Sequence, residues 1–237
     1  MKFAIIGYGK MGKEIHRIIE ARGGEVVLII DKDNQNELTK ENLTKADVAI
    51  EFSTPATALG NICACLEAGV AIVSGTTAWL ENMDKVEALC KSTEGRFFYA
   101  SNYSIGVNLL FRTSQYLAQL MNRFEEYDVT LDEVHHTEKK DAPSGTAITL
   151  AEGILSGIKR KNKWTLGETC DADTLGVAAI RRSVVPGTHT VTWESEVDQL
   201  ELKHTAKSRA GFAVGAVVAA EFLAQCPSGI YSMDDML

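Results

Sequence analysis

The sequence lacks the cysteine pattern of a disulfide scaffold or a zinc site. Its five cysteines form an odd set, and no CxxC pair or Cys/His cluster has metal-ligand spacing. We therefore expect reduced thiols, several of them buried in helices, and no bound metal. The cysteines are Cys63, Cys65, Cys90, Cys170 and Cys226.

Long hydrophobic runs and basic runs are also missing. No stretch approaches the roughly twenty apolar residues of a membrane span, and the first residues, MKFAIIGYGKMG, do not have the layout of a signal peptide. We expect a cytoplasmic protein. The net charge of -8 and the absence of a Lys/Arg-rich run argue against a nucleic-acid partner, because nucleic acid normally binds a basic surface.

The apolar content is high enough for a substantial core. Hydrophobic residues make up 45% of the 237 positions, a length that fits one large or two small domains. The first part of the chain alternates apolar stretches with helical patterns, which is typical of a parallel sheet with crossover helices. The expected strands are residues 2–7, 25–31, 47–53, 71–76 and 96–101, and the first expected helices are residues 10–23 and 54–69.

The pattern changes after an expected helix at residues 106–124. Period-two alternation then predicts antiparallel or mixed strands, and an apolar helix rich in small residues follows, which suits packing against the first domain. The strands are expected at residues 128–134, 176–185, 189–195 and 198–204, and the helix at residues 209–225. The predicted fold class is α/β: a Rossmann-type nucleotide-binding domain of residues 1–104 and 209–237, with a smaller α+β domain of residues 105–208 that carries an open mixed sheet.

The N-terminal stretch GYGKMG matches G-x-G-x-x-G, follows an apolar strand and opens a helix. In that context Gly7 makes the tight turn, Gly9 admits a pyrophosphate, and Gly12 lets helix and strand approach each other. Asp31, at the end of the next strand, suits the adenosine ribose of NAD, whereas Lys32 beside it suits the extra phosphate of NADP. The alternative is that these residues only shape a turn between strand and helix.

Two later strands end in loops of small residues, SGTT at residues 74–77 and SNYS at residues 101–104. In an open α/β sheet, ligands bind outside the carboxyl ends of the strands, where backbone amides of such loops can hold a carboxamide. Taken singly, either loop is equally well an ordinary turn. The residues predicted to contact a dinucleotide are Gly7, Gly9, Lys10, Met11, Gly12, Asp31, Lys32, Ser53, Gly75, Thr76, Thr77, Ser101, Asn102 and Tyr103.

The stretch EVHHTEKKDAPSGTA at residues 133–147 contains two histidines, two lysines and a helix start. His135 and His136 end an expected strand with their side chains on opposite faces. A zinc site is disfavoured because the two side chains diverge and no third ligand of suitable spacing is nearby. A histidine suits acid–base catalysis, and Lys139 supplies a positive charge for a carboxylate, whereas Lys140 is more simply a solvated loop residue.

The same stretch continues into the start of a helix. Ser144, Gly145 and Thr146 follow a proline, and their side chains and unpaired backbone N–H groups form an anion site at the positive end of the helix dipole. A proton donor, a cationic clamp and an amide-lined anion site together describe a pocket for a small dicarboxylate beside a nicotinamide.

The segment resembles the signature of the dihydrodipicolinate reductase family, Glu-x-His-His-x-x-Lys-x-Asp-Ala-Pro-Ser-Gly-Thr-Ala, and every fixed position is present. The likeness extends through GYGKMG, EFSTP and SGTT in the first domain and NYSIGVN at the crossover. It continues through PGTHTVTW in the second domain and LELKHTAKSRAGFAVGA near the end. It covers essentially the whole chain.

This resemblance implies an oxidoreductase that reduces 4-hydroxy-tetrahydrodipicolinate or dihydrodipicolinate to tetrahydrodipicolinate, with NADH or NADPH, in lysine (diaminopimelate) biosynthesis. It implies a homotetramer built through the second-domain sheet, and a hinge near Asn102 and near Ser208 and Arg209. It assigns His135 as general acid/base and Lys139 as catalytic. The residues expected to bind the substrate are His136, Ser144, Gly145, Thr146 and Arg209, with Lys139 also contacting a carboxylate.

Several positions depart from the family pattern. Ala78 stands where the family has the last glycine of Gly-Thr-Thr-Gly, and Ser101 and Tyr103 replace a proline and a phenylalanine. Ser183 stands where the second-domain motif commonly reads Arg-x-Gly. The loop after Asp31 is short, which affects the adenosine-end contacts more than the catalytic ones.

Two other functions share parts of this pattern. An NAD-dependent amino-acid dehydrogenase such as aspartate dehydrogenase would share the nucleotide domain but has no need of the 133–147 segment. A non-catalytic dinucleotide sensor would keep the glycine turn yet lose His135 or Lys139 freely, and both are intact. Arg181 and Arg182 are expected to place one guanidinium on each face of a strand, in a salt bridge or an interface contact, and His189 and His204 are expected to be structural.

Overall fold

The computed structural model describes residues 1–169 and 171–237, and these divide into two compact units. Unit 1 comprises Met1–Ser104 and Ala210–Leu237, and unit 2 comprises Ile105–Arg209. Cys170, one of the expected thiols, lies outside the described residues. The other cysteines carry free thiols, and Cys65 and Cys90 are buried.

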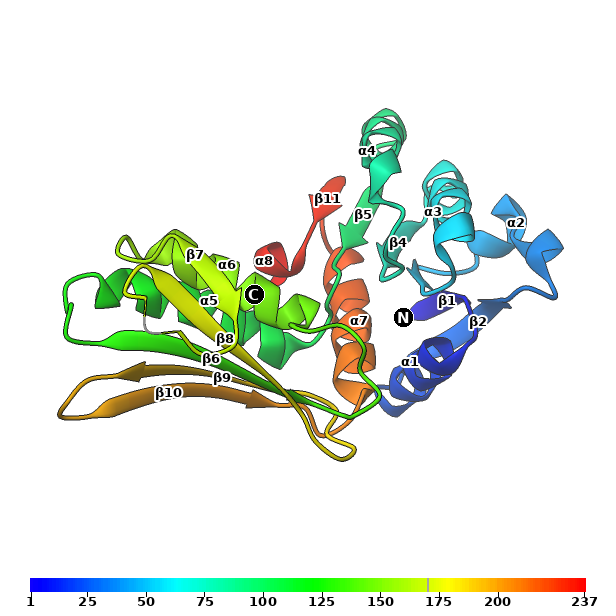
Figure 1. The fold of residues 1–237 in the computed structure, drawn as a ribbon. Coiled ribbons are helices and arrows are strands. Elements are labelled where there is room, and N and C mark those ends of the chain that lie inside the picture. The colour runs from blue at the N-terminus through cyan, green and yellow to red at the C-terminus, as the bar shows by residue number, and fades with distance from the viewer. Residues whose placement is uncertain (170) are drawn as a thin grey trace. The chain divides into compact units, whose positions relative to one another are not determined.

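Unit 1 is built on a sheet of parallel strands (Figure 1). They are β1 (Lys2–Ile6), β2 (Glu25–Ile30), β3 (Val48–Glu51), β4 (Ala71–Ser74), β5 (Arg96–Tyr99) and β11 (Gly229–Tyr231). The order across this six-stranded sheet is β11-β5-β4-β3-β1-β2, and each neighbouring pair is parallel. The chain therefore reverses its direction of travel between β1 and β3, which is the switch point where such sheets bind ligands. The predicted Rossmann-type sheet is confirmed, and the short strand β11, which we did not predict, extends it.

Helices cover both faces of this sheet (Figure 1). On one face, α1 (Lys10–Ala21) and α7 (Ala210–Leu223) pack against each other, and α7 also contacts β3, β4 and β5. The other face carries α2 (Lys40–Leu43), α3 (Pro55–Ala68) and α4 (Met83–Ser92). A short helix, α8 (Met233–Met236), follows β11.

The alternation of side chains along the strands explains this two-sided burial. Ala4 and Ile6 of β1 lie in the core beside α3, where they join Ile62. Phe3 and Ile5 point the opposite way and are equally buried. A strand that is buried on both faces has a continuous apolar sequence, as KFAII has.

Helix α7 approaches the sheet closely because it is rich in small residues. Ala213, Ala216 and Ala220 are fully buried. A Cβ at Gly215 would lie 1.7 Å from the carbonyl oxygen of Tyr103, so only glycine permits the contact. The helix thereby packs directly against the loop that follows β5.

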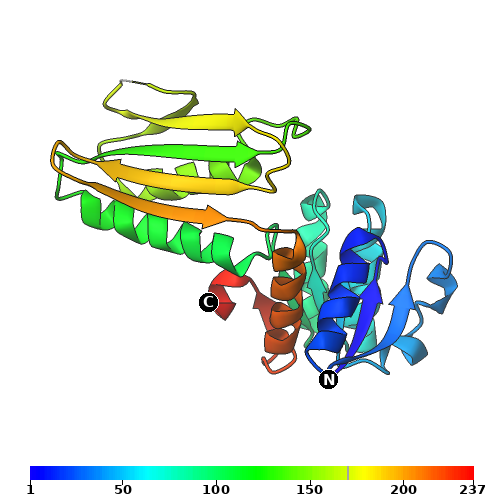
Figure 2. The ribbon, with the colours of Figure 1, turned by 90° about the horizontal axis from the view of Figure 1, so that it is seen from below.

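Unit 2 contains a five-stranded mixed sheet and two helices (Figure 2). The strands are β6 (Asp128–His135), β7 (Lys163–Leu166), β8 (Thr174–Arg181), β9 (Thr188–Glu194) and β10 (Gln199–Thr205), and the helices are α5 (Ile105–Met121) and α6 (Gly145–Gly157). The strand order is β10-β9-β6-β8-β7. Strands β6, β8 and β7 are parallel, and β9 and β10 join them as antiparallel strands. The predicted open mixed sheet is confirmed, and β7 is an additional strand.

Both helices of unit 2 pack against one face of this sheet. Val129 and Leu131 of β6 meet Ile154 of α6 in the core. The inward series then continues to Glu133 and His135, which are buried as well. The end of β6 therefore delivers two polar side chains to the side of the sheet that carries the core.

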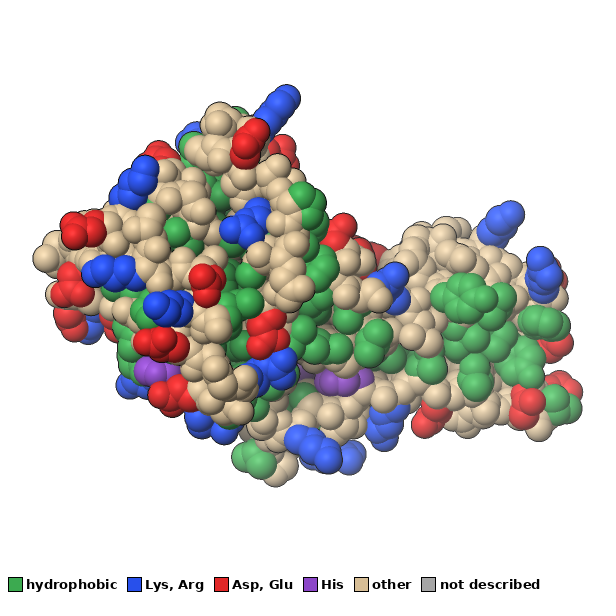
Figure 3. Space-filling model, turned by 180° about the vertical axis from the view of Figure 1, so that it is seen from behind, with side chains coloured by type: hydrophobic (Ala, Val, Ile, Leu, Met, Phe, Trp, Pro, Cys, Tyr) green, Lys and Arg blue, Asp and Glu red, His purple; other side chains and the backbone are tan. Residues whose placement is uncertain are grey.

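The molecular surface mixes charges of both signs. Figure 3 shows acidic and basic side chains interspersed on the face drawn, with hydrophobic side chains gathered between them. Leu109, Tyr116 and Leu120 are exposed hydrophobic side chains on α5. Within the described residues, every helix is too short or too polar to cross a membrane.

Candidate active site

The glycine turn between β1 and α1 contains three glycines with different roles. Gly7 has a φ of 94°, and a Cβ there would lie 2.1 Å from the carbonyl oxygen of Phe52. A Cβ at Gly12 would lie 2.1 Å from the carbonyl oxygen of Gly7. Around Gly9, no atom of the described residues lies within 4 Å of where a Cβ would stand. Gly7 and Gly12 thus serve the packing of the turn, and Gly9 leaves the start of α1 open to a ligand.

A cavity of about 490 Å³ opens at the carboxyl ends of β1, β3 and β4. This position is the switch point of the sheet, where dinucleotides bind in folds of this class. The lining contains many of the loop residues predicted to bind a dinucleotide: Gly9, Lys10, Met11, Ser53, Gly75, Thr76 and Thr77, together with Phe52 and Pro55. The structure therefore brings together the glycine turn, the loop after β3 and the SGTT loop, but not the SNYS loop.

Other residues predicted to contact a dinucleotide lie outside this lining. The hydroxyl of Tyr103 is buried and donates a 2.6 Å hydrogen bond to the carbonyl oxygen of Ser74, and burial raises the pKa of Tyr103 well above its usual range. Asn102 accepts a 2.9 Å hydrogen bond from the N–H of Ser104 through its side-chain oxygen. Ser101 is exposed. The Tyr103 side chain thus supports the end of β4, and a ligand would meet this residue only through its backbone.

The turn after β2 is fixed by an asparagine that the sequence analysis did not single out. The N–H of Asp31 donates to Oδ1 of Asn34 at 2.7 Å, and Nδ2 of Asn34 donates to the carbonyl oxygen of Ile29 at 2.9 Å. This bridge closes the short turn and leaves Asp31 half-buried beside the exposed Lys32. Asn34 therefore fixes the backbone at Asp31, the first of the two predicted adenosine-end residues.

A buried carboxylate that the sequence analysis missed lies beneath the cavity. Glu51 ends β3 and is fully buried. Its oxygens accept hydrogen bonds from the hydroxyls of Ser74 at 2.6 Å and Thr76 at 2.8 Å, and from both the N–H (2.9 Å) and the hydroxyl of Ser53. Ser53 and Thr76 also line the cavity. The only signal in the sequence is an acidic residue placed directly after an apolar strand.

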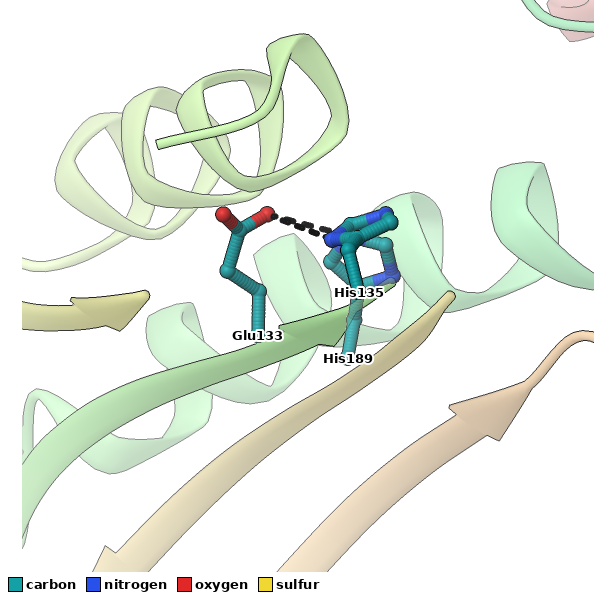
Figure 4. A group of neighbouring side chains, drawn as sticks. All are labelled: Glu133, His135 and His189. Carbon is teal, nitrogen blue, oxygen red and sulfur yellow. Dashed lines mark ion pairs between the residues drawn. The ribbon is translucent and has the colours of Figure 1, made fainter. Parts of the chain in front are cut away.

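In unit 2, the two histidines of the signature point to different environments. His135 is buried, whereas the next side chain along the strand, His136, is only partly buried. Nδ1 of His135 lies 3.3 Å from Oε2 of Glu133, although the angle falls short of a hydrogen bond. The rings of His135 and His189 meet edge to face at 5.2 Å. Figure 4 shows the three side chains turned toward one another.

Glu133 is the centre of this cluster. It is fully buried, and both of its oxygens accept from the N–H of Ser144 at 3.1 Å. Nη2 of Arg181 donates to Oε1 at 3.0 Å, and Nε2 of His189 lies 3.7 Å from Oε2. Burial alone would raise the pKa of Glu133, but the hydrogen bonds from Ser144 and Arg181 and the nearby His135 outweigh it and lower the pKa. The carboxylate is therefore ionised at neutral pH.

The two buried histidines are neutral at the same pH. Burial lowers the pKa of His135, and the positive charges of Lys139 and Arg181 act in the same direction against the opposing effect of Glu133. Burial also lowers the pKa of His189, to about 4. His189 further contacts the hydroxyl of Ser144 at 3.3 Å. The prediction that His189 is only structural is thus too narrow, since it contacts the same carboxylate as His135.

The cluster also has the spacing of a metal site. One ligand atom from each of Glu133, His135 and His189 lies within 4.8 Å of the others, so the structure supplies the third ligand that the sequence analysis did not find. However, the guanidinium of Arg181 and the N–H of Ser144 already occupy the carboxylate. A fixed positive charge at 3.0 Å disfavours a cation, and we interpret the cluster as one that handles protons.

The loop after β6 is held by Arg181, for which the sequence analysis proposed only a salt bridge or an interface contact. Nζ of Lys139 lies 2.8 Å from each carboxylate oxygen of Asp141. Arg181 donates to the carbonyl oxygen of Lys139 at 3.3 Å and to that of Asp141 at 2.6 Å. The conformation of the lysine-bearing loop therefore depends on a residue of a different strand.

The start of α6 differs from the prediction in one respect. The N–H of Ser144 is not free for a ligand, because it donates to Glu133. The Ser144 hydroxyl caps the helix by accepting from the N–H of Ala147 at 3.2 Å. Gly145 is exposed at the first position of the helix, followed by Thr146. An anion at this helix start would meet Gly145 and Thr146, whereas Ser144 supports the helix start from below. Arg209 is exposed at the last residue of unit 2.

Gly187 packs closely against the ring of His135. It precedes β9 with a φ of 156°, and a Cβ there would lie 3.0 Å from Nε2 of His135. Any larger residue would press on the ring nitrogen that faces away from Glu133.

Two family models together match nearly the whole chain. Residues 1–103 match the family model described as dihydrodipicolinate reductase, N-terminus, and residues 106–237 match that described as dihydrodipicolinate reductase, C-terminus. The chain is 46% identical over 237 residues to 4-hydroxy-tetrahydrodipicolinate reductase from Christiangramia forsetii, covering 100% of this chain and 98% of that protein. It is 38% identical over 205 residues to the enzyme of the same name from Chromobacterium violaceum, covering 82% of this chain and 74% of that one.

A solved structure supports the same fold. Dipicolinate-bound dihydrodipicolinate reductase from Paenisporosarcina sp. TG-14 superposes with a TM-score of 0.81 at 23% sequence identity, covering 100% of this chain and 99% of the other. Both halves of the chain and its signature segment thus point to one family. The chain belongs to the dihydrodipicolinate reductase family.

Proposed function

We propose that this chain reduces 4-hydroxy-tetrahydrodipicolinate, or the dihydrodipicolinate formed from it by dehydration, to tetrahydrodipicolinate in lysine biosynthesis. The reductant is NADH or NADPH. The observation that supports this most strongly is the group at the end of β6, where a buried histidine, a lysine-bearing loop and an open helix start lie in one unit. Relatives that match most or all of the chain are named as this reductase.

The cavity of unit 1 fits a dinucleotide. Gly9 has open space in front of it, and Thr76 and Thr77 lie across the cavity. The N–H groups at the start of α1 would hold the pyrophosphate, Asp31 the ribose, and Lys32 the extra phosphate of NADPH. When bound, the reduced nicotinamide supplies the hydride.

Unit 2 supplies groups that suit a cyclic dicarboxylate. His136 and Lys139 would bind the carboxylates together with Gly145 and Thr146, and Arg209 adds a further positive charge. Fixing both carboxylates orients the ring and stabilises the charge that builds on it during reduction. The relative from Paenisporosarcina was solved with dipicolinate, a cyclic dicarboxylate, which supports this substrate class.

His135 is the proposed proton donor. Hydride arrival at C4 of the ring leaves negative charge on C3 and the ring nitrogen, and His135 delivers the proton that neutralises it. In the free chain the pKa of His135 is lowered by burial and by the cations Lys139 and Arg181. A bound dianion would raise it, because an opposite charge favours the protonated form. Substrate binding would thus charge the acid that the reaction uses.

The remaining proposals concern assembly and location. The face of the unit 2 sheet opposite α5 and α6 includes the exposed Thr130, Glu201 and Lys203, and we propose it as the subunit contact of a homotetramer. Light scattering of the purified protein tests this. The free thiols of Cys65 and Cys90 suit the reducing cytoplasm, which is the proposed location.

The experiment that tests the function is loss of nicotinamide absorbance when the protein receives pyruvate, aspartate semialdehyde and a dihydrodipicolinate synthase that makes the substrate in place. NADH and NADPH are compared in parallel. Oxidation that requires the synthase and is inhibited by pyridine-2,6-dicarboxylate supports the proposal. Aspartate with the oxidised cofactor is the control for an amino-acid dehydrogenase, and turnover there without reductase activity would contradict the proposal.

A further inference from the structure

Arg181 contacts three separate parts of the proposed substrate site without facing open space. Its guanidinium donates to the carboxylate of Glu133, to the carbonyl oxygens of Lys139 and Asp141, and to its own strand at Ile180. Only 20% of its side chain is exposed. These donors are directed at protein acceptors, so the residue is built to hold other groups in position.

Strand register explains how these groups meet. His135 of β6 pairs with Arg181 of β8, and Glu133 of β6 pairs with His189 of β9. The N–H of Arg182 also donates to the carbonyl oxygen of His135 at 2.8 Å. Three neighbouring strands therefore bring the proton donor, its carboxylate and the guanidinium to one end of the sheet.

The pair formed by Glu133 and Arg181 links the two functional elements of the signature. Glu133 contacts the ring of His135 and fixes the start of α6 through the N–H of Ser144. Arg181 fixes the loop that carries Lys139. Because the two residues contact each other at 3.0 Å, a shift of either would move both elements.

We infer that Arg181, paired with Glu133, is a positioning residue that sets the geometry of His135 and of the Lys139 loop for catalysis. The inference rests on the proposed function. Arg181 acts through these neighbours and not by binding substrate itself. An arginine suits this role better than a lysine, because its planar guanidinium spreads five donors over a rigid fork, whereas a lysine has three donors on a single nitrogen.

The test compares the variants Arg181→Met and Arg181→Lys with the control Arg182→Met. Arg182 is the next residue along the chain, and its side chain is exposed. In the coupled assay, Arg181→Met is expected to lower kcat by about 100-fold, as expected for lost positioning of a charge and an acid. KM for NADH should not change. Arg181→Lys should recover part of this loss, and Arg182→Met should match the unchanged protein.

The pH profile of kcat provides a further test, because a residue that only stabilises the fold would leave this profile unchanged. His135 is faced by Glu133 on its own strand, Lys139 and Asp141 of the loop, Arg181 of β8 and His189 of β9. Removing the positive charge of Arg181 leaves Glu133 uncompensated, and both changes favour protonated His135. The limb of the kcat profile that reports His135 should therefore move to higher pH in Arg181→Met, by about one unit, and stay in place in Arg181→Lys.

Several outcomes would overturn the inference. A rise in KM for the dicarboxylate with unchanged kcat and pH limb would make Arg181 a direct substrate ligand. Unchanged kcat, KM and pH profile in Arg181→Met would show that Arg181 has no role in catalysis. If the melting temperature shows that Arg181→Met does not fold, Arg181→Lys alone tests the inference, and full activity in that variant would contradict it. Absence of turnover by the unchanged protein would instead contradict the proposed function.

Discussion

Each unit of the molecule contains one fully buried glutamate at the end of a strand, but the two carboxylates have different partners. Glu51 in unit 1 accepts from the hydroxyl of Ser74 and from Ser53 and Thr76, which line the dinucleotide cavity. Glu133 in unit 2 receives a guanidinium and an N–H, and it faces two histidines. Both glutamates organise the loops around them, yet only the second lies beside histidines, whose charge depends on pH.

The difference shows how similar burial serves two purposes. A hydroxyl can donate or accept, so the donors around Glu51 can adapt when their partner changes. A guanidinium and a backbone N–H can only donate, so Glu133 must remain an ionised acceptor. The carboxylate of unit 1 thus shapes the loops around the cavity. The carboxylate of unit 2 is, in addition, sensitive to the charge of its neighbours.

The largest effect is expected from removing the titratable groups that distinguish unit 2. His135→Gln and Lys139→Ala should each lower kcat by a factor on the order of 10²–10⁴, because they remove the proton donor or a charge that stabilises the reacting ring. The coupled assay measures this, with Lys140→Ala as the control for an exposed lysine of the same loop. Near-normal kcat in both variants would remove the assignment of this cluster as the reactive site.

The second prediction compares the two carboxylates directly. Glu133→Gln leaves Arg181 without its charge partner and turns an amide group toward donors that cannot accept, so it should reduce the free energy of unfolding by about 3 kcal/mol or more. Glu51→Gln meets adaptable hydroxyls and should cost only about 1–2 kcal/mol. Urea unfolding measures both. Equal losses in the two variants would show that the partners do not matter.

The same pair separates the functions of the units. Glu133→Gln should lower kcat, whereas Glu51→Gln should raise KM for NADH or NADPH and leave kcat nearly unchanged, because Ser53 and Thr76 line the cavity. A fall in kcat for Glu51→Gln with normal KM would contradict this division.

The third prediction concerns pH. The pKa of His189 is lowered from 6.5 to about 4, so the folded form stays neutral while the unfolded form takes up a proton. The stability that results is fully present above pH 6.5 and is lost as the pH falls toward 4, by about 3 kcal/mol in all. His135 adds to the same loss. The lowered pKa of Glu133 matters only at pH values below its ordinary 4.5.

Urea unfolding at pH values between 7 and 4 tests this. The fluorescence of Trp193, which lies in the unit 2 core, reports the unfolding in a Trp79→Phe, Trp164→Phe variant. His189→Gln should flatten the pH dependence. An unchanged slope in His189→Gln would mean that other groups cause the acid sensitivity.

The smallest effect concerns one residue in each unit. Ala78 has a φ of 62° and Ser183 a φ of 46°, a left-handed conformation that favours glycine, and both stand where the family pattern has glycine. Ala78→Gly and Ser183→Gly should each raise the free energy of unfolding by about 0.5–1 kcal/mol, after the greater freedom of unfolded glycine is subtracted. Thermal unfolding measures this, with Ala56→Gly, inside a helix, as a control that should destabilise. Destabilisation by Ser183→Gly would contradict the explanation.

The parts of the fold that follow from local pattern were predictable. The glycine spacing of GYGKMG and the apolar runs of the first strands are properties of neighbouring residues, and they placed the sheet and its turn. Strands β7 and β11 were missed because KWTL and GIY are short and carry little alternation.

The polar centre of unit 2 was only half predictable. The histidines and Lys139 lie in one continuous segment, so their proximity could be read from the sequence. Arg181 and His189 join them only through the pairing of β8 and β9 with β6. Strand register is a long-range property, and no local pattern reports it. For the same reason, the sequence did not reveal that the N–H of Ser144 donates to Glu133.

The placement of α7 has a consequence for the synthesis of the chain. Residues 210–237 supply α7 and β11, which cover β5 and pair with it, so the first part of unit 1 lacks these elements until that later segment has been made. At elongation rates of about 5–20 residues per second, the intervening Ile105–Arg209 take roughly 5–20 s to make. During that interval Phe98, which packs against Phe222 of α7 in the finished protein, has no cover on that side. The nascent sheet therefore exposes apolar surface for as long as unit 2 is being translated.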